Sequence, residues 1–231
     1  MTSVLFDWPY VGVIASIVLM GWLAVEKQPN GRPPRWRNPE WVLAWLWPMY
    51  LLHQFEEHGV DLFGRRYAFL EDLCTTLGYK SGACPADPAF IFAVNVVGCQ
   101  IAFALAWLYR WRRPLVAACA WGIPIVNAVA HIGGAVVHRS YNPGLVTSVA
   151  LFVPLSAWML VTALRSKAIL PRDIARIVAL GIVVHAVLMA SLQLRARGWI
   201  GHQQLLAING LNGLWPLAFG TLAAGPRTAG A

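Results

Sequence analysis

A succession of apolar runs, each about as long as a lipid bilayer is thick, constrains the fold more than any other feature of the sequence. A spanning helix needs ~20 mostly apolar residues, because the hydrocarbon core is ~30 Å thick and a helix rises ~1.5 Å per residue. Only 12% of the residues are charged, about half the share found in soluble domains. We therefore expect an all-α fold: a polytopic membrane helix bundle that forms a single transmembrane domain over residues 1–231.

The positions of these runs predict six or seven transmembrane helices. They cover residues 9–25, 41–63, 89–109, 115–138, 144–164, 173–193 and, with more polar residues, 203–223. The last stretch either spans the membrane or forms two shorter pieces broken at Pro216. The first run lacks the basic n-region and small-residue cleavage site of a signal peptide, so we expect it to remain as a helix.

Basic residues between the helices predict the topology. The connections after the first, third and fifth helices hold eleven lysines and arginines, and those after the second, fourth and sixth hold six. The positive-inside rule then places the N-terminus outside. Because the basic residues lie in short loops, the net charge of +8 is read as a topology signal and not as a nucleic-acid surface. We expect an integral protein of a bacterial inner membrane.

The connection over residues 65–88 is expected to be an extracytoplasmic loop. It contains Cys74 and Cys84, which could form a disulfide in an oxidising compartment. The alternative is that all cysteines are free thiols. Cys99 and Cys119 fall in apolar helices and are expected to be small core residues.

The stretch LLHQFEEHGV, residues 51–60, places two acids and two imidazoles directly after an apolar run. The apolar part, residues 41–52, would reach only ~18 Å as a helix, which does not cross a bilayer. Continuing the helix to residue 63 completes the span and places the cluster in the outer half of the membrane. Charged groups there mark a functional site. The alternative is a helix that ends at Leu52 and is followed by a solvated acidic loop.

On a helix, His53 shares a face with Glu56 (i,i+3) and with Glu57 (i,i+4). The two glutamates point ~100° apart, so different roles are expected for them. One could bind a metal or move protons, and the other could orient a neighbour. His58 is expected to point elsewhere.

The helix predicted at 115–138 carries Asn127, His131 and His138, whose spacings of four and seven keep them on one face. With its N-terminal end inside, this helix also brings both histidines to the outer half. They lie ~10 Å apart along a regular helix, so they would meet at one ion only if the helix bends at Gly133–Gly134.

At these positions the chain resembles the HXXEE-motif membrane proteins. HQFEE, residues 53–57, matches the motif in full, and the Asn127–His131 pair and YNPG, residues 141–144, are similar to further family features. The resemblance covers the second to fifth predicted helices. The family has no settled function, so the resemblance implies a site and little chemistry.

Imidazole and carboxylate ligands without thiolate suit zinc, with iron or manganese also possible. His53, His131 and either Glu57 or His138 could hold a catalytic zinc, and the remaining carboxylate, Glu56 or Glu57, could act as general base. Asn127 and Tyr141 are further candidate catalytic residues. The apolar surroundings favour a lipid or isoprenoid-like partner, so an intramembrane metal-dependent hydrolase is the leading hypothesis.

Three alternatives remain at this point. A buried glutamate that keeps its proton could drive a metal-free reaction, as in a membrane terpene cyclase whose carbocation is stabilised by Trp and Phe rings. The protein could instead be a transporter or a lipid- or metal-binding protein. The polar residues could also form only a structural hydrogen-bond network.

Overall fold

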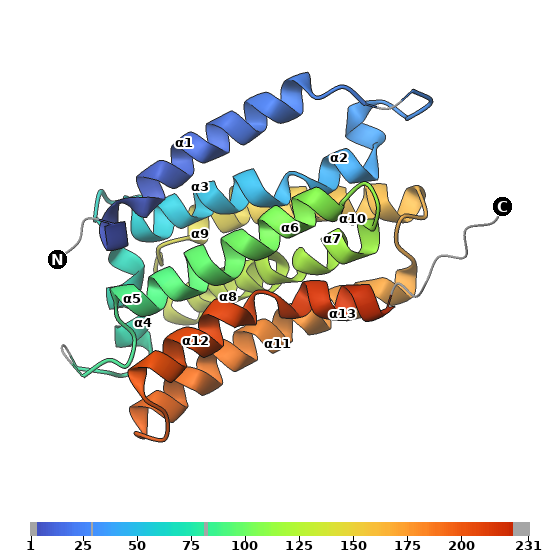
Figure 1. The fold of residues 1–231 in the computed structure, drawn as a ribbon. Coiled ribbons are helices and arrows are strands. Elements are labelled where there is room, and N and C mark those ends of the chain that lie inside the picture. The colour runs from blue at the N-terminus through green and yellow to red at the C-terminus, as the bar shows by residue number, and fades with distance from the viewer. Residues whose placement is uncertain (1–3, 29, 81–82, 224–231) are drawn as a thin grey trace.

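The computed structural model describes residues 4–28, 30–80 and 83–223, and every regular element within these ranges is helical. Figure 1 shows the long helices lying side by side in a bundle. Five helical segments are long and apolar enough to cross a membrane, and one further bent pair raises this number to six. An all-helical fold with several helices that could cross a membrane is therefore confirmed, whereas a seventh span and the external N-terminus remain predictions.

Proline starts three of these segments, where its missing N–H is not needed for a helical hydrogen bond. The segments are α1 (Val4–Val25); α5 (Pro88–Phe92), the π-helical η2 (Ala93–Gln100) and α6 (Ile101–Tyr109); α7 (Pro114–Ala120) and α8 (Gly122–His138); α9 (Leu145–Thr147), the π-helical η3 (Ser148–Phe152) and α10 (Val153–Arg165); and α11 (Pro171–Ala196). Proline is the first residue in the second, third and fifth segments, and also in the short helix α2 (Pro39–Leu43).

The last helical stretch consists of α12 (His202–Asn212) and α13 (Trp215–Ala223). The two helices meet at a bend of 44°. Of the two alternatives for residues 203–223, the structure therefore shows the two shorter helices. Together these helices could still form one broken span. The break comes before Pro216, which lies in the first turn of α13.

The helix predicted over residues 41–63 is two helices, α2 (Pro39–Leu43) and α3 (Leu46–His58). The side chain of Asn38 caps α2 by accepting hydrogen bonds from the backbone N–H groups of residues 40 and 41. Because α3 continues past Leu52, the whole HQFEE stretch is helical and the alternative of an acidic loop is wrong. The helix nevertheless ends at His58, because Gly59 begins a turn that Asp61 stabilises by accepting two backbone N–H groups.

The connection over residues 65–88 is not only a loop, since it contains α4 (Ala68–Thr76). Cys74 at the end of α4 is joined to Cys84 by a disulfide, as the sequence suggested. In Figure 1, α4 lies at the same end of the bundle as the start of α1 and the start of α12, while α2 and α13 lie toward the other end.

The helices α8 and α11 cross with their backbones in direct contact. A Cβ atom on Gly122 would overlap the carbonyl oxygen of Ile177, and one on Gly181 would overlap the carbonyl oxygen of Gly122. Only glycine permits this approach. The crossing positions His185, one turn after Gly181, near the polar face of α8.

Candidate metal centre

His53, Glu57 and His131 form a buried group whose ligand atoms all lie within 4.8 Å of one another. His53 and Glu57 come from adjacent turns of α3, and His131 comes from α8. Oε1 of Glu57 lies 3.4 Å from Nε2 of His53 and 3.1 Å from Nε2 of His131. The structure therefore brings together three of the four residues that the sequence suggested as metal ligands.

The protonation of the His53 ring follows from its neighbours. The hydroxyl of Thr147 donates to Oε2 of Glu56 at 2.5 Å. The oxygen of this hydroxyl lies 2.8 Å from Nδ1 of His53. Since the single hydroxyl proton is used by Glu56, the hydroxyl accepts a hydrogen bond from Nδ1–H. In the neutral ring Nε2 of His53 is then left with its lone pair, and this buried nitrogen has no hydrogen-bond partner among the described residues.

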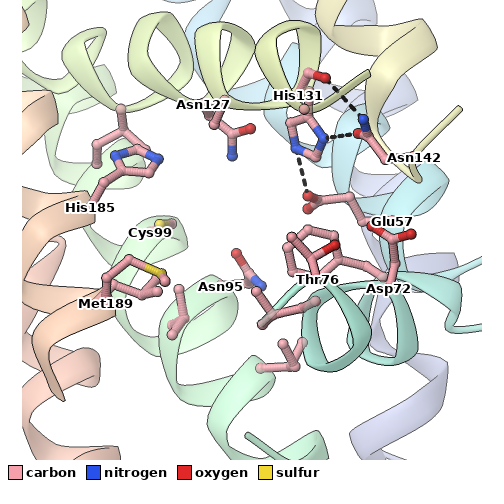
Figure 2. A pocket seen from close by; sticks show the side chains of 18 of the residues that line it. Glu57, Asp72, Thr76, Asn95, Cys99, Asn127, His131, Asn142, His185 and Met189 are labelled. Atoms are coloured by element: carbon pink, nitrogen blue, oxygen red, sulfur yellow. Dashed lines mark hydrogen bonds and ion pairs between the residues drawn. The ribbon is translucent and has the colours of Figure 1, made fainter. Parts of the chain in front are cut away.

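Asn142 fixes the His131 ring in the same way. The Asn142 amide nitrogen donates to the backbone oxygen of His131 at 2.9 Å, which turns its amide oxygen toward Nδ1 of His131 at 2.6 Å. Nδ1 therefore carries a proton, and in the neutral ring Nε2 presents a lone pair. Figure 2 shows this bidentate contact together with the approach of His131 to Glu57.

Two imidazole lone pairs and a carboxylate oxygen thus converge in a buried place with no donor between them. Such an arrangement is electrostatically unfavourable unless a cation, either a proton on one imidazole or a metal ion, joins the acceptors. Two histidines and a glutamate are a ligand set of catalytic zinc sites, and each Nδ1–H donates to an oxygen, as in ordered metal sites. The donor set therefore fits a divalent metal ion, without selecting zinc over iron or manganese.

The second oxygen of Glu57 is held from the other side. The amide nitrogen of Gln54 donates to Oε2 at 2.7 Å, and Nε2 of His58 lies 3.5 Å from the same atom. His58 is buried and also lies 3.2 Å from the amide nitrogen of Asn95 on η2. His58 was expected to point elsewhere, but the structure places it beside the carboxylate.

Glu56 has a different environment from Glu57, as the ~100° separation predicted. It is buried at the N-terminus of the helical segment 145–165, where it accepts four hydrogen bonds at 2.5–3.0 Å. The donors are the hydroxyls of Tyr141 and Thr147 and the backbone N–H groups of Val146 and Thr147. Both carboxylate oxygens are therefore occupied, and Glu56 orients His53 through Thr147.

Tyr141 lies in the connection between α8 and α9, and it is a neighbour of Glu56 and not of the ligand group. Its hydroxyl donates to Glu56 at 2.9 Å and accepts the backbone N–H of Leu62 at 3.2 Å. Burial raises the pKa of Tyr141 above its ordinary value, and the Glu56 charge raises it further. The hydroxyl therefore keeps the proton that it donates.

Gly144 covers the two imidazoles. A Cβ atom at this position would lie 2.7 Å from Cε1 of His131 and 2.8 Å from Cε1 of His53. The residue also has φ +97°, a conformation that favours glycine. The sequence contained a signal for this residue, because a glycine after Asn-Pro is typical of a turn with positive φ.

A cavity of about 540 Å³ opens beside Glu57 and His131 (Figure 2). Its walls come from α3, α4, α5, η2, α8, the connection after α8 and α11, and most of the wall surface is apolar. Asn127 lines it one turn before His131, and His138 lines it near the end of α8. Because α8 runs unbroken through Gly133–Gly134, His138 stays outside the ligand group.

Within the described part of the chain no tryptophan lines this cavity, and its aromatic residues are Tyr50, Phe69 and Phe90. The ring-lined pocket that a terpene cyclase needs for its carbocation is therefore poorly matched. The tryptophans of the described ranges all lie elsewhere.

A family model described as "Protein of unknown function with HXXEE motif" matches residues 44–159, half of the chain. The chain belongs to this family. No curated protein and no solved structure matches the chain. The part shared with the HXXEE family contains all three candidate ligands and the residues that orient them, so the site belongs to the region that defines the family.

Three residues of the site were missed or underrated in the sequence. Gln54 is the second residue of HQFEE and faces Glu57 from i,i−3, a spacing that could have indicated the contact. His58 and Gly144 could not be placed from spacing, because their contacts depend on how α3, η2 and the 139–144 connection pack together.

Proposed function

We propose that the protein is a membrane-embedded, metal-dependent hydrolase that acts on a lipid or isoprenoid-like molecule in the cavity. The observation that carries this proposal is the convergence of three acceptors, Nε2 of His53, Nε2 of His131 and Oε1 of Glu57, beside a largely apolar cavity. Three protein ligands leave a position for water or substrate on the metal, as in catalytic zinc sites.

When bound, a divalent ion lowers the pKa of a water molecule and polarises a carbonyl group. Neither glutamate of the motif is free to act as the base, because Glu57 belongs to the ligand group and Glu56 accepts four hydrogen bonds. Asp72 on α4 is the other carboxylate in the cavity wall. Burial raises its pKa above the ordinary value for an aspartate, although Arg65 opposes the shift. A raised pKa suits an acid–base group, and we assign this role to Asp72.

We also propose that the site faces the extracytoplasmic side of a bacterial inner membrane. The basic connections after the first, third and fifth predicted helices support this orientation. The Cys74–Cys84 disulfide next to the cavity supports it independently, because disulfides persist in oxidising compartments.

Hydrolysis can be tested in H₂¹⁸O without knowing the substrate. Zinc-loaded protein would be placed in nanodiscs that contain total lipid extract from the producing cells, and the products would be analysed by mass spectrometry. We expect a product that carries one ¹⁸O and is absent with Glu57→Gln, which loses a metal ligand. Asp72→Asn should keep the metal but lower the rate by at least about 100-fold. If wild type forms no ¹⁸O-labelled product beyond the Glu57→Gln background, the hydrolase proposal is wrong.

A further inference from the structure

The charges around the cavity restrict the ligand. Its lining contains two carboxylates, Glu57 and Asp72, and three imidazoles, but no lysine or arginine among the described residues. Sites for phosphate or carboxylate groups are normally built with arginine or lysine. The two carboxylates would also balance a divalent ion held by the ligand group. The cavity therefore matches an uncharged molecule better than an anionic lipid.

Two polar side chains in the cavity wall take no part in holding the metal ligands. Asn127 lies on α8 one turn before His131, and His185 lies on α11. Figure 2 shows both side chains directed into the cavity. The contact of α8 and α11 at Gly122 and Gly181 holds the helices that carry them close together.

The hydrogen bonds of these two residues define what they can still bind. Nδ1–H of His185 donates to the backbone oxygen of Gly181 at 2.8 Å, so Nε2 retains its lone pair. The amide oxygen of Asn127 is buried and has no hydrogen-bond partner within the described residues. A rotation of this amide presents either its oxygen or its N–H₂ group to a ligand. Together the pair offers an acceptor from His185 and an acceptor or a donor from Asn127.

A hydroxyl group complements this pair, because it donates one hydrogen bond and accepts others. A carbonyl or an ether oxygen accepts only, so it would leave Nε2 of His185 unsatisfied. We propose that Asn127 and His185 form a subsite for a hydroxyl group on an uncharged, long-chain amphiphile. One helical turn separates Asn127 from His131, so this hydroxyl would lie roughly 5–6 Å, or about four bonds, from the group bound at the metal ligands.

The proposal names the substrate class of the proposed hydrolase and rests on that function for the reaction, but binding itself requires no catalysis. The test therefore uses metal-stripped protein in nanodiscs and tritiated 1-O-dodecylglycerol, an ether that cannot be hydrolysed as an ester. Competitors would be the unlabelled ether, its dimethylated form and dodecyl phosphate, with empty nanodiscs as the partition control. Asn127→Leu and His185→Phe would be compared with Val129→Leu, which alters a mostly exposed side chain of α8.

We expect the dimethylated ether and the phosphate to compete at least about fivefold more weakly than dodecylglycerol. Each subsite variant should weaken dodecylglycerol binding by about five- to tenfold, the effect of one lost hydrogen bond, and leave binding of the dimethylated form unchanged. Both should retain wild-type metal content. Equal competition by the dimethylated ether, strongest competition by the phosphate, or metal loss in either variant would overturn the subsite. Absence of metal or hydrolysis in the wild type would instead refute the proposed function. The interpretation of the binding result would not change, because the assay uses metal-stripped protein.

Discussion

Gly144→Ala is expected to lower the affinity for the metal by about 100-fold, although no ligand is removed. The new Cβ would lie 2.7 Å from Cε1 of His131 and 2.8 Å from Cε1 of His53, so at least one ring must move away from Glu57. The left-handed conformation at φ +97° adds a cost of about 1–2 kcal/mol to folding. Affinity would be measured by competition with a chromophoric chelator in detergent.

The variant Gly198→Ala separates the effect of backbone strain from that of steric overlap with the imidazoles. Gly198 also has a positive φ, +74°, but a Cβ there would meet no atom within 4 Å. We expect this variant to be less stable than wild type by a similar amount and to bind metal normally. Wild-type metal affinity in Gly144→Ala would show that Gly144 does not pack on the ligands as described.

Glu56→Gln is expected to lower the free energy of unfolding by about 3 kcal/mol and to weaken metal binding. The glutamine amide has one oxygen, whereas Glu56 accepts four hydrogen bonds from three residues. Its N–H₂ group would face donors, and each buried group left unsatisfied costs about 1–3 kcal/mol. The Thr147 hydroxyl would also lose the partner that orients it toward His53.

Unfolding by SDS in mixed micelles and metal content would be measured for Glu56→Gln and for Glu71→Gln, an exposed control on α4. Thr147→Ser keeps the hydroxyl and should bind metal as wild type does, whereas Thr147→Val should not. If Glu56→Gln matched the Glu71→Gln control in both measurements, Glu56 would not be a positioning residue.

The long helices could be predicted from the sequence because an apolar run of this length is typical of a helix that crosses a membrane. The face of α3 that carries His53 and Glu57 also followed from sequence, since i,i+4 neighbours must lie together. His131 could be named as a candidate ligand because the predicted direction of its helix places it in the same half of the membrane as His53 and Glu57. These predictions need only helical geometry and the topology rule.

Other features depend on contacts between distant parts of the chain. The spacing of Glu56 and Glu57 predicted that their surroundings differ but not which one faces the histidines, because Thr147 and Tyr141 lie about 90 residues away. His138 shares a face with His131, but two helical turns of unbroken α8 keep it from the ligand group. The end of α3 at His58 was also missed, because Gly59 and Asp61 form a turn inside the stretch that the membrane thickness predicted to be helical.

The central claim is that His53, Glu57 and His131 hold one divalent metal ion between α3 and α8. Metal content per chain, measured by inductively coupled plasma mass spectrometry on detergent-purified protein, tests it most directly. Wild type would be compared with His53→Ala, His131→Ala and His138→Ala, the last being a histidine of the same cavity outside the ligand group. The account predicts about one zinc, iron or manganese ion per chain in wild type and His138→Ala, and loss in the other two variants. Metal-free wild-type protein, or equal loss in His138→Ala, would contradict it.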